Sequence, residues 1–128
     1  VFDALRPEWT IAVPALLKGL VYSEAALAKL ETWLLDFEVE QFGVFRKAAA
    51  KDGIRAEVGA VDFAKLGIRI METALEGLGS SEEKWLLPYF DRYTKHQCMP
   101  ADEVVAGFER SGSSVGRWLK KLLPDPNV

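Results

Sequence analysis

The distribution of apolar and polar residues along the chain predicts a series of helices around one unusually apolar segment. The segment Thr10–Tyr22 has one charged residue, Lys18, and its eight Ala, Val, Ile and Leu residues fall on every side of a helical wheel. A helix that is apolar all round is expected to be buried on most of its circumference. Pro14 falls in the first turn, where its missing N–H costs little. We therefore expect a buried central helix over Thr10–Tyr22, around which later helices pack.

Three amphipathic helices are predicted in the middle of the chain, each preceded by a residue that favours the N-cap position. They are capped by Ser23 with an end near Leu35, by Asp36 over residues 37–50, and by Asp62 over residues 63–78. Phe37, Val44, Phe45 and Ala48 form the expected buried side of the helix over residues 37–50. Residues 54–60 are expected to form a linker with some extended character.

The last third of the chain predicts three further helices. Ser80 and Glu83 fit a capping box, and Pro88 inside the helix that follows predicts a kink or a later start. Pro100 favours the start of a helix that ends near Ser111. A final helix is expected to turn Val115, Trp118, Leu119, Leu122 and Leu123 inward and to end at Pro124. No segment alternates convincingly with period two. The pattern predicts an all-α fold, a single compact domain of six or seven helices.

Composition limits the classes of function. The 128 residues suffice for one domain over residues 1–128, and the net charge of −3 argues against nucleic acid, which selects a basic surface. The apolar helix is far shorter than the roughly 20 residues that a membrane span needs. A single cysteine, Cys98, and the lack of a secretory signal favour a cytoplasmic setting. Because the chain starts without Met, we expect it to be part of a longer protein.

Reactive side chains cluster in the segment 93–99, where a loop leads into a helix. Lys95 and His96 are candidates for contacting an anion held at the helix N-terminus. The alternative is a polar connector with a half-buried thiol at Cys98. Asp102 and Glu103 occupy the first turn of the helix and would repel an anion, so the residues alone favour the connector.

Other motifs are better explained by structure than by chemistry. Ser81 and Lys84 have the S-x-x-K spacing of some acylating enzymes but lack the companion motifs, and they fall where a helix cap is expected. The segment 112–116 is glycine-rich but has no Lys after it, so a turn between helices explains it. Glu72 and Glu76 lie on a charged outer stripe without a neighbouring His. From the residues alone, the chain is a helical domain of unassigned function.

The segment Val13–Tyr22, followed by Ser23-Glu-Ala-Ala-Leu27, resembles a stretch of the glutamate–cysteine ligases of the plant and proteobacterial type. The likeness continues in order through most of the chain and covers Phe37, Arg46, Gly53-Ile54, Ala74, Gly77-Leu78 and the segment 100–103. The family usually carries aromatics near Leu16-Leu17 and an arginine near Lys95. The chain is similar to the C-terminal helical part of these enzymes.

The resemblance implies part of an ATP-dependent ligase of glutathione biosynthesis, which joins glutamate to cysteine through an acyl phosphate with Mg²⁺ shielding the phosphates. It places the acidic metal ligands and the nucleotide-binding sheet in a missing N-terminal catalytic region. No catalytic or metal-binding residue is then expected on this chain, which is predicted to be inactive alone. Lys95, His96 and Arg46 are the candidate substrate-binding residues. The alternative is a stand-alone helical interaction module without activity.

Overall fold

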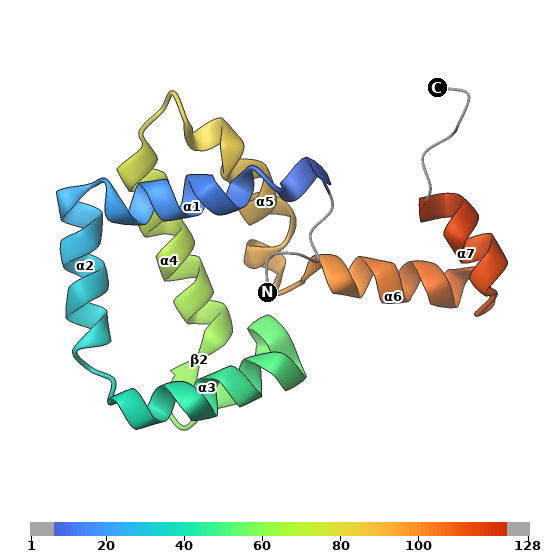
Figure 1. The fold of residues 1–128 in the computed structure, drawn as a ribbon, viewed down its shortest axis with the longest axis horizontal. Coiled ribbons are helices and arrows are strands. Elements are labelled where there is room, and N and C mark those ends of the chain that lie inside the picture. The colour runs from blue at the N-terminus through green and yellow to red at the C-terminus, as the bar shows by residue number, and fades with distance from the viewer. Residues whose placement is uncertain (1–6, 123–128) are drawn as a thin grey trace. The chain divides into compact units, whose positions relative to one another are not determined.

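The computed structural model describes residues 7–122, which form seven α-helices, short 3₁₀ turns and one small hairpin (Figure 1). The elements are η1 (Pro7–Trp9), α1 (Ala12–Val21), α2 (Glu24–Leu34), α3 (Val39–Asp52), η2 (Gly53–Arg55), β1 (Glu57–Val58), β2 (Val61–Asp62), α4 (Phe63–Leu78), η3 (Glu83–Trp85), α5 (Leu87–Arg92), η4 (Thr94–His96), α6 (Pro100–Arg110) and α7 (Val115–Leu122). The all-α class is confirmed.

The chain divides into two compact units, Val1–Cys98 and Met99–Val128, and each is described by itself. The first unit contains all elements from η1 to η4, and the second contains α6 and α7. Whether the two units make up the single domain that we expected stays a prediction.

Two of the predicted N-caps start their helices as expected. The Ser23 hydroxyl accepts a hydrogen bond from the backbone N–H of Ala26 at 3.3 Å and begins α2. The Asp62 carboxylate accepts from the N–H groups of Ala64 and Lys65 at 3.0 and 3.3 Å and begins α4. Both caps satisfy amide groups that have no partner inside the helix, so these boundaries are fixed locally by the sequence.

The start of α3 differs from the prediction, because Asp36 is not its cap. The backbone N–H groups of Asp36 and Phe37 donate to the carbonyls of Trp33 and Leu34, which extends the end of α2 as a turn. Helix α3 begins after Glu38, whose N–H donates to the side chain of Gln41 at 2.7 Å. The predicted inward face of α3 is correct only in part: Phe45 and Ala48 are half-buried, but Val44 is 54% exposed and no residue of α3 is fully buried.

The fifth predicted helix begins later than the Ser80 and Glu83 pattern indicated. Residues Glu83–Trp85 form the 3₁₀ turn η3, and α5 starts at Leu87 with Pro88 in its first turn. Of the two alternatives that Pro88 predicted, a kink or a later start, the structure shows the later start. The first turn of a helix does not need the N–H that proline lacks.

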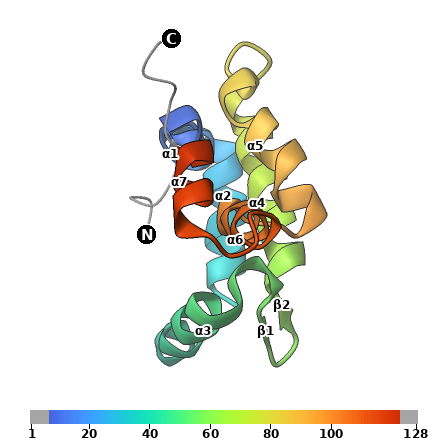
Figure 2. The same cartoon turned by 90° about the vertical axis from the view of Figure 1, so that its right-hand side faces the viewer.

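A short antiparallel hairpin occupies part of the expected linker. Val58 pairs with Val61 and Glu57 with Asp62, and Gly59 adopts the left-handed backbone conformation in the turn, with φ of 59°. Figure 2 shows this hairpin beside α3, at the start of α4. The paired segments have only two residues each, too few for an alternating pattern to be visible in the sequence.

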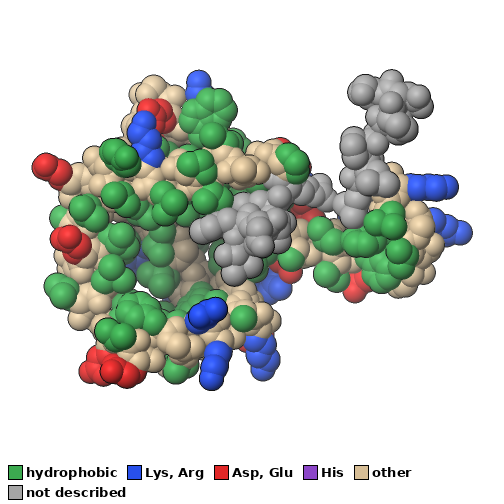
Figure 3. Space-filling view, viewed as in Figure 1, with side chains coloured by type: hydrophobic (Ala, Val, Ile, Leu, Met, Phe, Trp, Pro, Cys, Tyr) green, Lys and Arg blue, Asp and Glu red, His purple; other side chains and the backbone are tan. Residues whose placement is uncertain are grey.

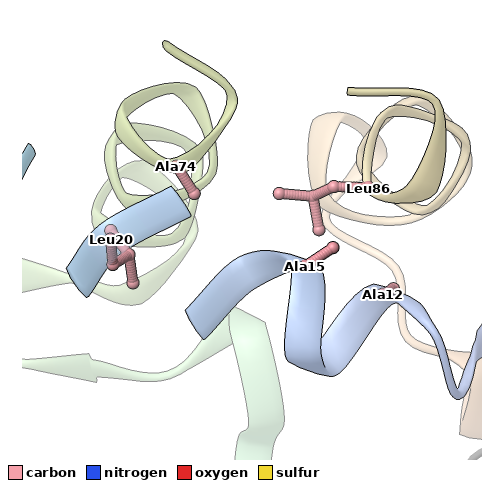
Figure 4. Packing of buried hydrophobic residues seen from close by; sticks show 5 residues of the cluster. All are labelled: Ala12, Ala15, Leu20, Ala74 and Leu86. Carbon is pink, nitrogen blue, oxygen red and sulfur yellow. The ribbon is translucent and has the colours of Figure 1, made fainter. Parts of the chain in front are cut away.

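The core of the first unit lies where α1 crosses α4 (Figure 1). Its buried members are Ala12, Ala15, Leu20, Ala74 and Leu86 (Figure 4). Small residues make the crossing close. A methyl group placed on Gly19 would lie 2.2 Å from the carbonyl oxygen of Ala74, and one placed on Gly77 would lie 2.0 Å from the carbonyl oxygen of Gly19. Both distances are far below a van der Waals contact, so this backbone approach requires glycine at both positions.

Helix α1 has more buried residues than any other described helix, namely Ala12, Ala15, Gly19 and Leu20. Its burial is nevertheless one-sided. Ile11, Leu17 and Val21 are 47%, 51% and 53% exposed. The expectation that the helix is buried on most of its circumference is therefore corrected, because the described part of the chain covers only the face that meets α4 and α5.

The second unit is a helical hairpin. The turn after α6 passes through Gly112 and Ser113, which have φ of 69° and 56°. The Ser111 hydroxyl is buried and donates to the carbonyl of Phe108 at 2.6 Å, and the rings of Phe108 and Trp118 meet edge to face at 5.6 Å. Val115 and Leu119, which we expected to face inward, are 56% and 42% exposed. The side chain of Leu122, and residues Leu123 and Pro124, lie outside the described part.

Within residues 7–122, no helix by itself has the length and apolar character of a membrane span. The segments Pro7–Val21 and Glu24–Leu34 reach the required length and composition only when taken together, and they are bent by 87° at their junction.

We expect Gly19→Ala to destabilise the first unit strongly. The added methyl group meets the backbone of Ala74, which cannot move aside without separating α1 from α4, and overpacking of this kind costs about 1–3 kcal/mol or more. Gly43→Ala is the matched control: the new methyl group has nothing within 4 Å, and the better helix propensity should stabilise α3 by about 0.5–1 kcal/mol. Urea denaturation of both variants measures the difference, and equal midpoints would contradict the close crossing.

Leu20→Ala should lower the free energy of unfolding by about 2–5 kcal/mol, because Leu20 is 7% exposed in the core. Leu17→Ala removes the same atoms from a side chain that is 51% exposed, so its effect should stay below about 1 kcal/mol. Thermal or chemical unfolding of the pair tests whether burial of α1 is one-sided. A loss of several kcal/mol for Leu17→Ala would show that its exposed face is covered.

Candidate functional site

The loop that carries the candidate residues Lys95 and His96 forms the turn η4, and buried residues hold this turn in place. Tyr93 and Thr94 are 1% and 3% exposed, and the N–H of Cys98 donates to the carbonyl of Tyr93 at 3.0 Å. Gln97 takes the left-handed backbone conformation, with φ of 54°, and its carbonyl accepts from Arg55 Nη1 at 3.5 Å. The loop thus has a fixed backbone and exposed side chains at Lys95 and His96.

Lys95 is exposed but already interacts with the preceding helix α5. Its ammonium group forms an ion pair with the carboxylate of Asp91 one helical turn earlier, and it lies 4.8 Å from the centre of the Phe90 ring. An exposed ion pair of this kind contributes little and is exchanged readily for another anion. His96 is exposed, and its backbone carbonyl accepts a hydrogen bond from Cys98 Sγ at 3.3 Å. This half-buried thiol is the one that the connector interpretation placed here.

The N-terminus of α6, the candidate anion site, is occupied by a side chain of the helix itself. The Asp102 carboxylate accepts a hydrogen bond from the N–H of Met99 at 2.8 Å. This contact satisfies the helix N-terminus with a negative group from the same turn.

Arg46 lies apart from the loop in sequence and environment, on α3. The structure brings Lys95 and His96 together in one turn, but places Arg46 in the wall of a pocket to which neither of them contributes. Arg46 forms no hydrogen bond or ion pair with any residue in the range 7–122. Its helical neighbours one turn away are Phe42, Gly43, Ala49 and Ala50, none of which is acidic.

The pocket lies between α2, α3 and α4 and has a volume of about 360 Å³. The lining residues are Leu30, Trp33, Leu34, Phe37, Phe42, Phe45, Arg46, Ala49, Phe63, Leu66 and Ile70. Figure 3 shows hydrophobic side chains around the hollow between α2 and α3. Arg46 is the single charged residue in this lining.

Edge-to-face contacts between aromatic rings fix the wall of the pocket. Phe45 is at their centre, with ring centroids 5.3 Å from Phe37, 6.2 Å from Phe42 and 5.8 Å from Phe63. On α2, the Trp33 ring lies 4.4 Å from the guanidinium carbon of Arg69. These arrangements are favourable for aromatic rings and for a cation on a ring, so the pocket has defined walls.

The sequence interpretation assigned these aromatic residues to the core, and it missed the pocket. The available signal was the spacing of Phe37, Phe42 and Phe45 in a segment with few other large apolar residues. Such a segment can supply one face of a cavity but cannot fill it.

A second aromatic cluster near η4 was also missed. Trp9 meets the rings of Tyr89 and Tyr93 edge to face, at 5.8 and 5.3 Å, and the guanidinium of Arg92 lies over Trp9 at 5.8 Å. Burial, and secondarily the neighbouring Tyr93, raise the pKa of the Tyr89 phenol above its usual 10.0. Tyr89 therefore stays protonated at neutral pH and serves as a packing group.

The remaining motifs have structural roles. The Glu76 carboxylate accepts from Lys29 at 2.8 Å and joins α4 to α2, while Lys84 lies 5.0 Å from the Trp85 ring. No group of three or more His, Cys, Asp or Glu side chains suited to a metal ion occurs among residues 7–122. Among the described residues, no such cluster marks a site for the Mg²⁺ that the ligase resemblance implies.

Comparison of the chain with models of known protein families, with curated proteins and with solved structures found no match.

Proposed function

We propose that the chain is the C-terminal helical portion of a cytoplasmic, ATP-dependent glutamate–cysteine ligase. The observation that carries the proposal is the place of the ligase-like residues in the fold. Gly19, Ala74 and Gly77 all belong to the ligase-like series, and they are the residues at the α1–α4 crossing. The resemblance thus includes positions where the packing tolerates only small residues, which supports the proposal.

The exposed face of α1 supports a role as part of a larger protein. Leu17 and Val21 lie on this face, and each is close to half exposed. Exposed apolar surface on a helix is typical of a site that packs against another protein part. In the proposed enzyme, this face packs against the region that carries the metal ligands and the nucleotide site.

The described chain has a supporting role in this proposal. Residues 7–122 contain no cluster of three metal ligands, and the lining of the pocket contains no acidic group. The binding of ATP phosphates and the joining of glutamate to cysteine belong to the missing N-terminal region. Lys95 and His96 on the turn η4 are the proposed substrate-binding residues in one wall of the site.

The second candidate is a stand-alone helical interaction module. It is favoured by the same α1 face, which could bind a separate partner. Inspection of the gene distinguishes the two: an upstream coding region with an acidic, strand-rich pattern supports the ligase, and a start codon just before Val1 supports the module.

The proposal is tested by assaying ADP release with ATP, Mg²⁺, glutamate and cysteine. We expect the 128-residue chain to be inactive and the full-length product of its gene to be active. Turnover by the chain alone would contradict the assignment of catalysis to the missing region, and an inactive full-length protein would favour the module.

In the full-length protein, Leu17→Glu tests the α1 face directly. We expect a large loss of activity, because the carboxylate enters an apolar interface, while the isolated variant unfolds at the same midpoint as the unmodified chain. Leu35→Glu makes the same change at a side chain that is 86% exposed outside α1 and should retain activity.

Lys95→Ala in the full-length enzyme should lower kcat/KM for glutamate or ATP by an amount equivalent to about 1–3 kcal/mol, the scale of a charge-assisted hydrogen bond. Lys95→Arg should retain or improve it, because the family carries arginine near this position and its planar group can bind an anion through two hydrogen bonds.

Lys84→Ala is the control for the Lys95 variants, because Lys84 is also exposed and also lies over an aromatic ring. Steady-state kinetics of the three variants decide the outcome. Unchanged kcat and KM for Lys95→Ala would show that the loop is only a connector.

A further inference from the structure

The pocket between α2, α3 and α4 has the character of a small-molecule site. Its volume of about 360 Å³ falls within the range of ligand pockets, roughly 300–1,000 Å³, which are mostly apolar with a few placed polar groups. The ring contacts of Phe45 join the α3 wall to Phe37 and to Phe63 at the start of α4. Phe42 and Leu34 nevertheless remain 43% and 46% exposed, so an apolar occupant would cover surface that is now in water.

The charge beside the pocket indicates the polar end of this occupant. Arg46 is the single charged residue in the lining, to which it adds its hydrocarbon stem. Its side chain is exposed, and the guanidinium group has no hydrogen-bond or ion-pair partner within residues 7–122. Arginine presents a planar set of donors that matches a carboxylate with two hydrogen bonds. No acidic residue lines the pocket, so nothing there opposes an anion.

From this combination we propose that the pocket binds a single-chain fatty acid, with the hydrocarbon chain between the aromatic walls and the carboxylate on the Arg46 guanidinium. A polar anion such as a free amino acid does not fit, because the ten other lining residues offer only apolar side chains. A neutral hydrocarbon is also a poorer ligand, because it offers no hydrogen-bond acceptor to the Arg46 guanidinium. The proposal is independent of the proposed ligase function and needs no catalytic activity.

The direct test is calorimetric titration of the 128-residue chain with octanoate, decanoate and dodecanoate below their micelle concentrations. Affinity should rise with chain length, by up to about fourfold for each methylene group that enters the pocket. Dodecanol is the matched uncharged ligand and should bind more weakly than dodecanoate. Absence of saturable dodecanoate binding would overturn the proposal.

Three variants locate the binding. Arg46→Gln should weaken dodecanoate about tenfold and leave dodecanol unchanged, since only the charged contact is lost. Lys47→Gln removes the neighbouring cation, which is not in the lining, and should leave both ligands unchanged. Ala49→Trp places a large ring in the pocket and should abolish binding of both, with circular dichroism verifying that the helices are retained.

Two results would contradict the assignment of the site. Equal losses of dodecanoate affinity for Arg46→Gln and Lys47→Gln would indicate nonspecific attraction to the positive charges of α3. Full dodecanoate affinity in both Arg46→Gln and Ala49→Trp would place binding on another apolar surface, such as the exposed face of α1.

Discussion

The close approach of α1 and α4 is the constraint on which the rest of the first unit depends. The carbonyl oxygens of Gly19 and Ala74 occupy space that a side chain at Gly77 or Gly19 would need. Interiors are packed at crystal-like density, so this contact allows the helices a single distance and register. Once α1 lies against α4 in this way, Leu20 and Leu86 are enclosed, and α2 follows from the bend at Ser23.

The same crossing explains why so much apolar surface remains exposed. Helix α1 can meet α4 with only one face, and its other face keeps Leu17 and Val21 half exposed. At the opposite end of α4, three helices surround Phe45 without filling the space between them. Apolar area in water is unfavourable, so both surfaces are the places where a further protein part or a ligand would contribute most to stability.

The charged candidates separate into two environments with different chemistry. Lys95 is on a fixed turn, where its charge already meets Asp91 and solvent. Arg46 adds its hydrocarbon stem to an apolar wall, and its exposed charge meets no described partner. Both were candidate substrate-binding residues because glutamate and ATP are anionic. Their separation follows from the fold, since α3 faces α2 and α4 while the turn η4 follows α5.

The sequence alone determined the helical class, the bounds of α4 and the caps at Ser23 and Asp62. Each of these depends on contacts within one helical turn. The tertiary structure alone decided that burial of α1 is one-sided and that the phenylalanines around Phe45 line a pocket. Periodicity shows that a face is apolar, but whether that face is covered depends on contacts between residues far apart in the chain.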